Sequence, residues 1–271
     1  MKRTLLARLA LSAAIFAEGT TPTNSAIFDR DDREYVSPVL GSPYSPVGLV
    51  TAGTVFWLRS AGFLADDCHV LTSHMIVGYG AAPVGKRAKF EVGIGTSQYA
   101  SSKGTIVAGG QIERLQPGQD LYKTGGGDWL LLRLDQCLGA RVGHVALRTG
   151  PYSPYEFRDL KSAGYPVHRS RNRGITVDPS CRVLGGTERI WVNDCATTRG
   201  DAGDPIFQVS NSGPMAQMQV YAMQAYGATP REPIPMTPGL ANGAIPMSYI
   251  APQIARFLST DTAAPLEAST R

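Results

Sequence analysis

The stretch T-T-R-G-D-A-G-D-P-I-F, residues 197–207, decides the fold. Two glycines, Gly200 and Gly203, bracket its centre, and the mostly apolar stretch P-I-F-Q-V at 205–209 follows. Glycine tolerates backbone angles that other residues resist, so this loop can hold a shape that most sequences cannot. The pattern predicts a Gly-rich loop that leads directly into a β-strand.

Two other segments belong with this loop. The first, C-H-V-L-T-S-H-M-I-V at 68–77, reads as a strand that runs into a small-residue turn and then His74. The second, G-G-D-W-L-L-L-R-L at 126–134, is a glycine turn that places Asp128 just before a buried strand. A histidine, an aspartate and a glycine loop therefore follow one another along the chain, each at the end of a strand.

Short β-rich runs fill the rest of the chain in two sets of about six, on either side of a Pro-containing connection near residue 150. Closed antiparallel barrels would leave neither set with open edges. The one clear helical pattern is the apolar face formed by Ile250, Ile254, Phe257 and Leu258, and Pro252 is expected in its first turn. The predicted strands lie at 47–50, 54–58, 69–72, 88–92, 104–108, 129–134, 160–163, 174–177, 181–184, 189–193, 205–209, 218–226 and 243–246.

The sequence thus predicts an all-β fold with two antiparallel six-stranded β-barrels and a C-terminal helix. The expected organisation is a signal peptide at 1–17, an N-terminal lead at 18–46, a first barrel at 47–150, a second barrel with the helix at 151–259, and a disordered tail at 260–271.

The three segments, in this order, resemble the trypsin-like serine peptidase superfamily. Its pattern is a strand and small-residue turn ending in His, then Asp before apolar residues, then Gly-Asp-Ser-Gly-Gly/Ser-Pro. More narrowly, the chain is similar to secreted bacterial glutamyl endopeptidases in three further elements: D-R at Asp32–Arg33, G-Y-P at 164–166 and N-G-A at 242–244. The resemblance covers roughly residues 27–259 and implies a trypsin-like fold with its site between two barrels.

The resemblance also implies roles for individual residues. His74 would be the general base, Asp128 would orient it, and residue 202 would be the nucleophile, with the N–H groups of Gly200 and residue 202 as the oxyanion hole. Residue 202 is Ala, however, so there is no hydroxyl for a base to activate. Asp204 is a second departure, because the family has Gly or Ser at that place. Asp120 and Asp135 compete with Asp128 for the acidic role, although Asp135 follows its strand instead of preceding it.

Two functions remain open from the sequence. The first is a secreted peptidase homologue, hydrolytically inactive, that binds a polypeptide substrate or ligand in the cleft. The alternative is an active serine endopeptidase, with a Ser-His-Asp triad, whose serine was mutated to Ala202 in this chain. Neither function requires a cofactor or a metal, and no C-x-x-C pair suggests a zinc site.

Four residues are expected to form the substrate pocket by resemblance: Ala196 and Thr197 at its floor, and Gln224 and Tyr226 on the following strand. No acidic residue stands at the floor, so a preference for Lys or Arg is not expected. The glutamyl branch uses a His where Gln224 stands, so a preference for Glu is not expected either. A small or apolar residue before the scissile bond is the remaining prediction.

Four cysteines in an exported chain suggest two disulfides. Three pairings are possible. Cys181 and Cys195 are close in sequence and flank one strand-rich stretch, which favours a bond between them and leaves Cys68 with Cys137.

The first 17 residues combine a basic start with an apolar run that ends in small residues, which is typical of a signal peptide. Its removal takes away three of the 26 basic residues and none of the 22 acidic ones, so the net charge falls from +4 to +1. A nearly neutral protein gives no electrostatic case for binding nucleic acid or a membrane. The expectation is a secreted or periplasmic monomer.

Overall fold

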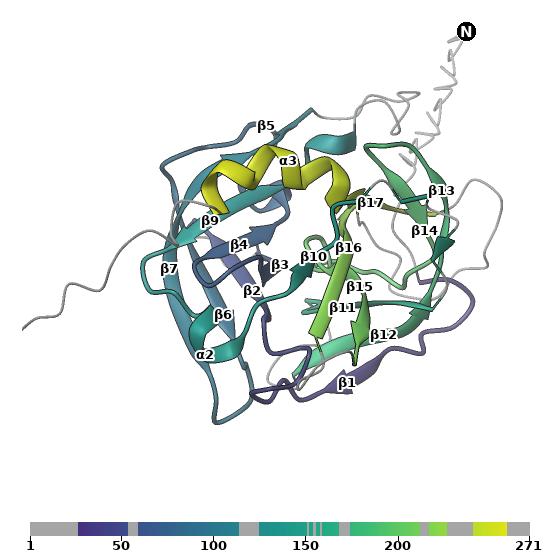
Figure 1. Cartoon of the computed structure of the whole chain (residues 1–271), viewed down its shortest axis with the longest axis horizontal. Coiled ribbons are helices and arrows are strands. Elements are labelled where there is room, and N and C mark those ends of the chain that lie inside the picture. The colour runs from purple at the N-terminus through teal and green to yellow at the C-terminus, as the bar shows by residue number, and fades with distance from the viewer. Residues whose placement is uncertain are drawn as a thin grey trace, which may run out of the picture.

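The computed structural model describes residues 27–53, 59–113, 125–150, 152–153, 156–157, 159–167, 174–211, 217–226 and 241–258. The predicted signal peptide, the tail at 260–271, the strand at 54–58 and Asp120 lie outside the described residues. Figure 1 shows two sets of strands side by side, with the helix α3 (Met247–Leu258) along one end.

The first set closes into a six-stranded antiparallel barrel in the order β2-β3-β4-β9-β7-β6. Side chains from alternate positions fill it, among them Phe90, Ile106 and Leu132, all with no exposed surface. A small hairpin-like pair, β5 (Gly80–Ala81) and β8 (Gln111–Ile112), lies beside it. The barrel strands are β2 (Val47–Ala52), β3 (Arg59–Leu64), β4 (His69–Thr72), β6 (Arg87–Val92), β7 (Ala100–Gly109) and β9 (Leu130–Leu134).

The second set follows the path β12-β11-β15-β16-β17-β14-β13. The two end strands of this path, β12 and β13, are separated in sequence by Arg182 alone. The sheet therefore curves so that its two ends come together at this residue. Two β units with a C-terminal helix agree with the predicted fold class, but this second unit is a half-barrel sheet and not the closed six-stranded barrel that the sequence predicted. Its strands are β11 (Leu160–Gly164), β12 (Ile175–Cys181), β13 (Val183–Gly186), β14 (Trp191–Asn193), β15 (Pro205–Ser210), β16 (Gln217–Tyr226) and β17 (Asn242–Pro246).

Two strands were not predicted and widen this sheet. β1 (Glu34–Val36) pairs antiparallel with β12, so the N-terminal lead packs on the second barrel. β10 (Ala146–Leu147) pairs parallel with β16 from the connection between the barrels. β3 was also missed, because its sequence R-S-A-G-F-L begins with small and polar residues instead of β-branched ones.

In the part of the chain that the structure describes, short helical segments accompany the strands: 3₁₀ helices at His74–Val77 and Gly125–Gly127, and α2 (Gly139–Val142). The predicted C-terminal helix is α3 (Met247–Leu258), which buries Ile250 and Ile254. It begins three residues before the predicted apolar face, so Pro252 lies inside the helix and not in its first turn. None of the helices in the described ranges is long and apolar enough to cross a membrane.

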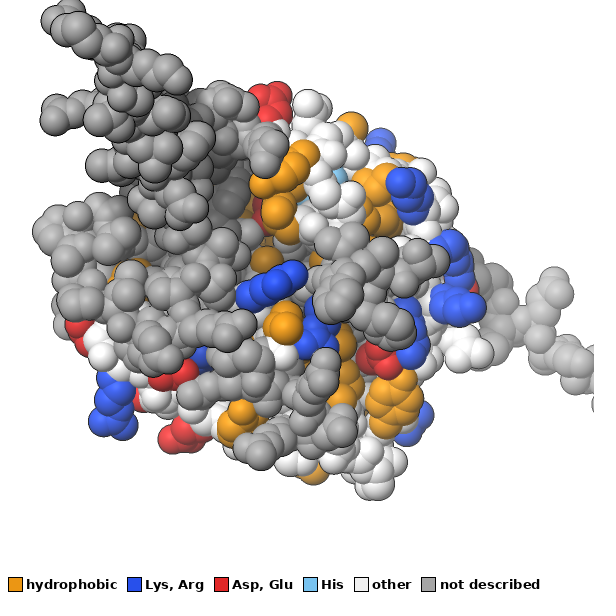
Figure 2. All heavy atoms as spheres, turned by 180° about the vertical axis from the view of Figure 1, so that it is seen from behind, with side chains coloured by type: hydrophobic (Ala, Val, Ile, Leu, Met, Phe, Trp, Pro, Cys, Tyr) orange, Lys and Arg blue, Asp and Glu red, His pale blue; other side chains and the backbone are white. Residues whose placement is uncertain are grey.

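A shared apolar core joins the two barrels. It contains Phe63 and Leu131 from the first, Phe207 and Met223 from the second, and Ile250 from α3. Both predicted disulfides are confirmed: Cys68–Cys137 links two parts of the first strand set, and Cys181–Cys195 links two parts of the second. On the described part of the face in Figure 2, basic and acidic side chains are interspersed among apolar ones.

Candidate active site

The Gly-rich loop from the second barrel is bonded directly to the first barrel. The N–H of Ala61, in β3, donates to the carbonyl oxygens of Ala202 at 3.0 Å and Gly200 at 3.2 Å. The Ser60 hydroxyl also donates to the Ala202 carbonyl and lies 3.2 Å from the hydroxyl of Thr72, the last residue of β4. The loop therefore lies against the strand pair that leads to His74.

Gly203 fixes the shape of this loop. Its φ of +89° is in the left-handed region, and a Cβ there would lie 2.1 Å from the carbonyl oxygen of Ala61. Its N–H donates to the carbonyl of Gln224 at 2.7 Å, which anchors the loop on β16 as well. The close approach of the two barrels at Ala202 therefore depends on the absence of a side chain at residue 203.

Asp128 is fully buried at the end of the turn before β9. Its Oδ1 accepts from the Ser73 hydroxyl at 2.7 Å and from the Met75 N–H at 3.0 Å, while its Oδ2 has no hydrogen-bond partner. Burial raises the pKa of Asp128 to about 7, against the opposing effect of hydrogen bonds from Ser73 and from the backbone of Met75 and His74. The carboxyl group is thus tied to the turn that carries His74.

The His74 side chain points into the protein and is 1% exposed. Burial lowers its pKa, opposed by interactions of the ring with the backbone of Gly110 and Gly127. Its Nδ1 has no hydrogen-bond partner. The hydrogen bond predicted between His74 and Asp128 is therefore not formed in this structure, although the two residues belong to one hydrogen-bonded turn.

Comparison with known proteins rests on structure, because no protein-family model and no curated protein matches the sequence. A solved structure of a Glu endopeptidase matches with a TM-score of 0.62 and 17% identity, over 86% of this chain and 98% of that one. An inactivated protease paralogue of the scabies mite matches with a TM-score of 0.54 and 14% identity, over 83% and 99%.

The chain has the trypsin-like serine protease fold. At these identities the likeness concerns the fold alone. In this trypsin-like framework Ala202 lies at the centre of the loop between the barrels, partly buried, with a methyl group for a side chain. The oxyanion role of the Gly200 and Ala202 N–H groups stays a prediction.

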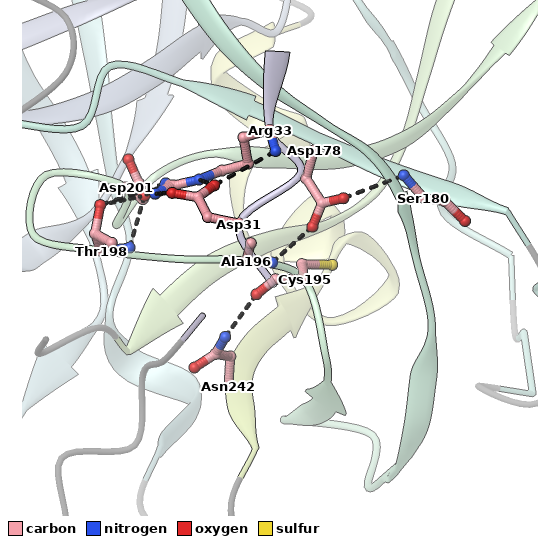
Figure 3. Close-up of polar contacts among 9 residues, drawn as sticks. All are labelled: Asp31, Arg33, Asp178, Ser180, Cys195, Ala196, Thr198, Asp201 and Asn242. Carbon is pink, nitrogen blue, oxygen red and sulfur yellow. Dashed lines mark hydrogen bonds and ion pairs between the residues drawn. The ribbon is translucent and has the colours of Figure 1, made fainter. Parts of the chain in front are cut away.

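A buried ion pair holds the other side of the loop (Figure 3). Arg33 reaches from the N-terminal lead to donate to Asp201 Oδ2 at 2.9 Å, and it also pairs with Asp31. Thr198 donates to the same Asp201 oxygen through its N–H at 2.7 Å and its hydroxyl at 3.1 Å. The sequence suggested Asp32–Arg33 only as a family motif. The structure shows that this arginine neutralises the acid next to Ala202.

Asp204 is the least compensated acid of the loop. It is buried, and its Oδ1 has no hydrogen-bond partner. Burial and the neighbouring charge of Asp201 raise its pKa well above the ordinary value, while Arg33 opposes the shift. Burial likewise raises the pKa of Asp201 to about 6, opposed first by Arg33. The carboxyl of Asp204 lies against Gly164, where a Cβ would come within 1.7 Å of Oδ1.

Three of the four predicted pocket residues are buried in a polar network. Gln224 has no exposed surface, and its Oε1 accepts from Asn193 at 3.3 Å. Asn242 in turn donates to the Cys195 carbonyl at 2.6 Å. Ala196 and Thr197 lie beside this network, 7% and 0% exposed, and the Tyr226 side chain lies outside the described residues. The substrate-pocket role of these residues remains a prediction.

A buried acid that the sequence pattern does not reveal lies beside the predicted pocket floor. Asp178, in β12, accepts from the Ala196 N–H at 2.6 Å and from the Ser180 N–H at 3.1 Å (Figure 3). Burial raises its pKa to about 6. Asp178 lies 18 positions before Ala196 in the sequence, so no local motif connects it with the pocket floor. Among the described residues, no group of three or more His, Cys, Asp and Glu side chains is arranged to hold a metal ion.

Proposed function

We propose that this chain is an exported trypsin-like protease homologue that holds polypeptide segments between its barrels without cutting them. The observation that carries the proposal is Ala202 at the centre of the loop docked on β3. Acyl transfer in this fold needs a hydroxyl at that place and an imidazole that removes its proton. The first is absent, and the His74 ring is not hydrogen-bonded to Asp128.

Two observations support a fold that is retained without the activity. The loop keeps its contacts to both barrels through Ala61 and Gln224, although the side chain at its centre has no reactive group. One similar structure is named as an inactivated protease paralogue, so the fold occurs without the activity. Export to the outside or the periplasm is supported by the two disulfides and by the leader-like first 17 residues.

The alternative is an active serine endopeptidase in which only the nucleophile was replaced. The packing of Asp204 weighs against it. This second departure from the family pattern is buried against Gly164, in the field of Arg33. A loop that departs from the family pattern at two positions, 202 and 204, favours inherited divergence over the exchange of a single side chain.

The test uses the wild-type protein and a library of unstructured peptides that carry a photo-activated cross-linker. We expect no cleaved peptide by mass spectrometry, and cross-links on the segment 196–203 and on β16. Cleavage by the pure protein would refute inactivity, and cross-links confined to other surfaces would refute binding in the cleft. The variant Ala202→Ser, assayed in parallel, separates the alternative, because restored cleavage by this single change would favour it.

A further inference from the structure

The side chain of residue 74 lies on the wrong side of its turn to serve as a base. In the 3₁₀ helix His74–Val77, His74 and Ile76 are buried and Met75 is the exposed member, at 38%. Successive residues of a 3₁₀ helix point about 120° apart, so His74 and Met75 cannot face the same region. The His74 imidazole occupies the interior, against the backbone of Gly110 and Gly127.

The backbone of Met75, like that of His74, lies beside the Asp128 carboxylate, but the Met75 side chain leaves the turn on the exposed side. The Met75 N–H donates to Asp128 Oδ1 at 3.0 Å, and the second carboxylate oxygen is buried with no partner. Only the Cα separates the Met75 nitrogen from its Cβ. An imidazole on residue 75 could therefore offer one nitrogen to Oδ2 and direct the other outward, which His74 cannot do from its buried position.

Position 75 follows closely on the strand end that is hydrogen-bonded to the loop of Ala202. The Thr72 hydroxyl donates to the Ala61 carbonyl at 2.6 Å, and Ala61 donates to the Ala202 carbonyl at 3.0 Å. The turn that begins after Thr72 carries Met75 three residues later. The side of the turn from which Met75 emerges is thus fixed relative to the loop of Ala202.

From these contacts we propose that residue 75, and not residue 74, is the position from which a base would act in this chain. The inference rests on the proposed function and deepens it: hydrolysis is absent because two positions, Met75 and Ala202, lack the reactive groups. In the reaction that the pair Met75→His and Ala202→Ser would restore, the imidazole takes the serine proton while the oxygen attacks the carbonyl carbon. It then returns the proton to the leaving amine.

The first test reads the imidazole directly. In Met75→His, the pKa of the new imidazole, measured by NMR, is expected to lie at least one unit above its value in Met75→His combined with Asp128→Asn. Loss of the carboxylate charge removes the stabilisation of the protonated ring. Tyr79→His, on an exposed residue near the same turn, is the matched control and should not respond to Asp128→Asn. Equal pKa values at position 75 with and without the Asp128 carboxylate would overturn the proposal.

The second test reads reactivity with a fluorophosphonate, which labels an activated serine. Ala202→Ser alone should stay unlabelled, Met75→His with Ala202→Ser should be labelled, and adding His74→Ala to that pair should leave labelling within about threefold. Labelling of Ala202→Ser alone that disappears with His74→Ala would assign the base to His74 and overturn the inference. So would a folded double variant that stays unlabelled. Labelling of the wild type would instead refute the proposed function, so the two failures are distinguishable.

Discussion

Removal of the Arg33 guanidinium should destabilise the protein more than any other single change in the N-terminal lead. Its side chain is 3% exposed and is paired with Asp201, whose side chain is 1% exposed. Arg33→Ala would leave Asp201 and Asp204 without the cation that opposes their raised pKa values. Loss of one partner of a buried ion pair costs about 3–5 kcal/mol, which in a chain of this size lowers the Tm by roughly 10 °C.

The loss should depend on pH, because the burial of these acids has already raised their pKa values. A carboxyl group whose pKa is higher in the folded than in the unfolded protein makes its full contribution to the free energy of unfolding below the unfolded pKa. This contribution is lost as the pH rises through the folded pKa. The pKa of Asp201 is about 6 with Arg33 present and should rise further without it. The difference in free energy of unfolding between wild type and variant should therefore be small at pH 5 and large at pH 8.

Urea unfolding of both proteins at pH 5 and pH 8, with oxidised disulfides, measures this difference. Arg30→Ala is the matched control, since Arg30 belongs to the same lead and is exposed. It should change stability by no more than about 0.5 kcal/mol. If Arg33→Ala costs no more than Arg30→Ala at pH 8, or costs equally at both pH values, the role given to the ion pair is refuted.

Three further predictions concern the site and its scaffold. Gly203→Ala should destabilise the protein by several kcal/mol in thermal unfolding, because its Cβ would lie 2.1 Å from the Ala61 carbonyl oxygen. The control Gly41→Ala has a φ of +81° and no atom within 4 Å of the new Cβ, so it should show only the backbone strain of about 1–2 kcal/mol. Because the pKa of Asp128 is raised to about 7, the free energy of unfolding of the wild type should fall as the pH rises from about 4 to 7, and Asp128→Asn should reduce this fall. An equal fall in both proteins, measured by urea unfolding, would contradict this. Replacing Cys68 and Cys137 by Ser should cost about 4 kcal/mol and replacing Cys181 and Cys195 about 3, because the chain-entropy cost grows with the logarithm of the sequence separations of 69 and 14. The opposite order in urea unfolding would contradict the chain-entropy argument.

Much of the fold was predictable because its signals are local. The alternation in 88–92 and the apolar run in 130–134 identify barrel strands on their own, and the spacing of Ile250 and Ile254 identifies α3. β3 carries no such signal, since its centre is Gly62, where a Cβ would lie 2.8 Å from the carbonyl oxygen of Leu71 in β4. The partner of the N-terminal lead was likewise invisible, because β1 is defined only by its pairing with β12.

The candidate site was predictable in composition but not in side-chain direction. Strand ends at Thr72 and Leu130 place His74 and Asp128 in one region, and this much follows from the order of segments. A turn longer or shorter by one residue decides whether His74 or Met75 faces the Asp128 carboxylate. The sequence pattern does not fix the length of the turn to one residue. The Arg33–Asp201 pair was also beyond local reasoning, because 168 residues separate its members.

The central claim is that the trypsin-like fold is retained without an activated nucleophile. Intact-protein mass spectrometry of the pure, disulfide-bonded wild type, after exposure to excess fluorophosphonate, tests it most directly. The mass should stay unmodified at every pH from 5 to 9, since Ala202 offers no hydroxyl. A stoichiometric adduct that forms on the folded protein, and that does not form when the protein is unfolded before the probe is added, would contradict it.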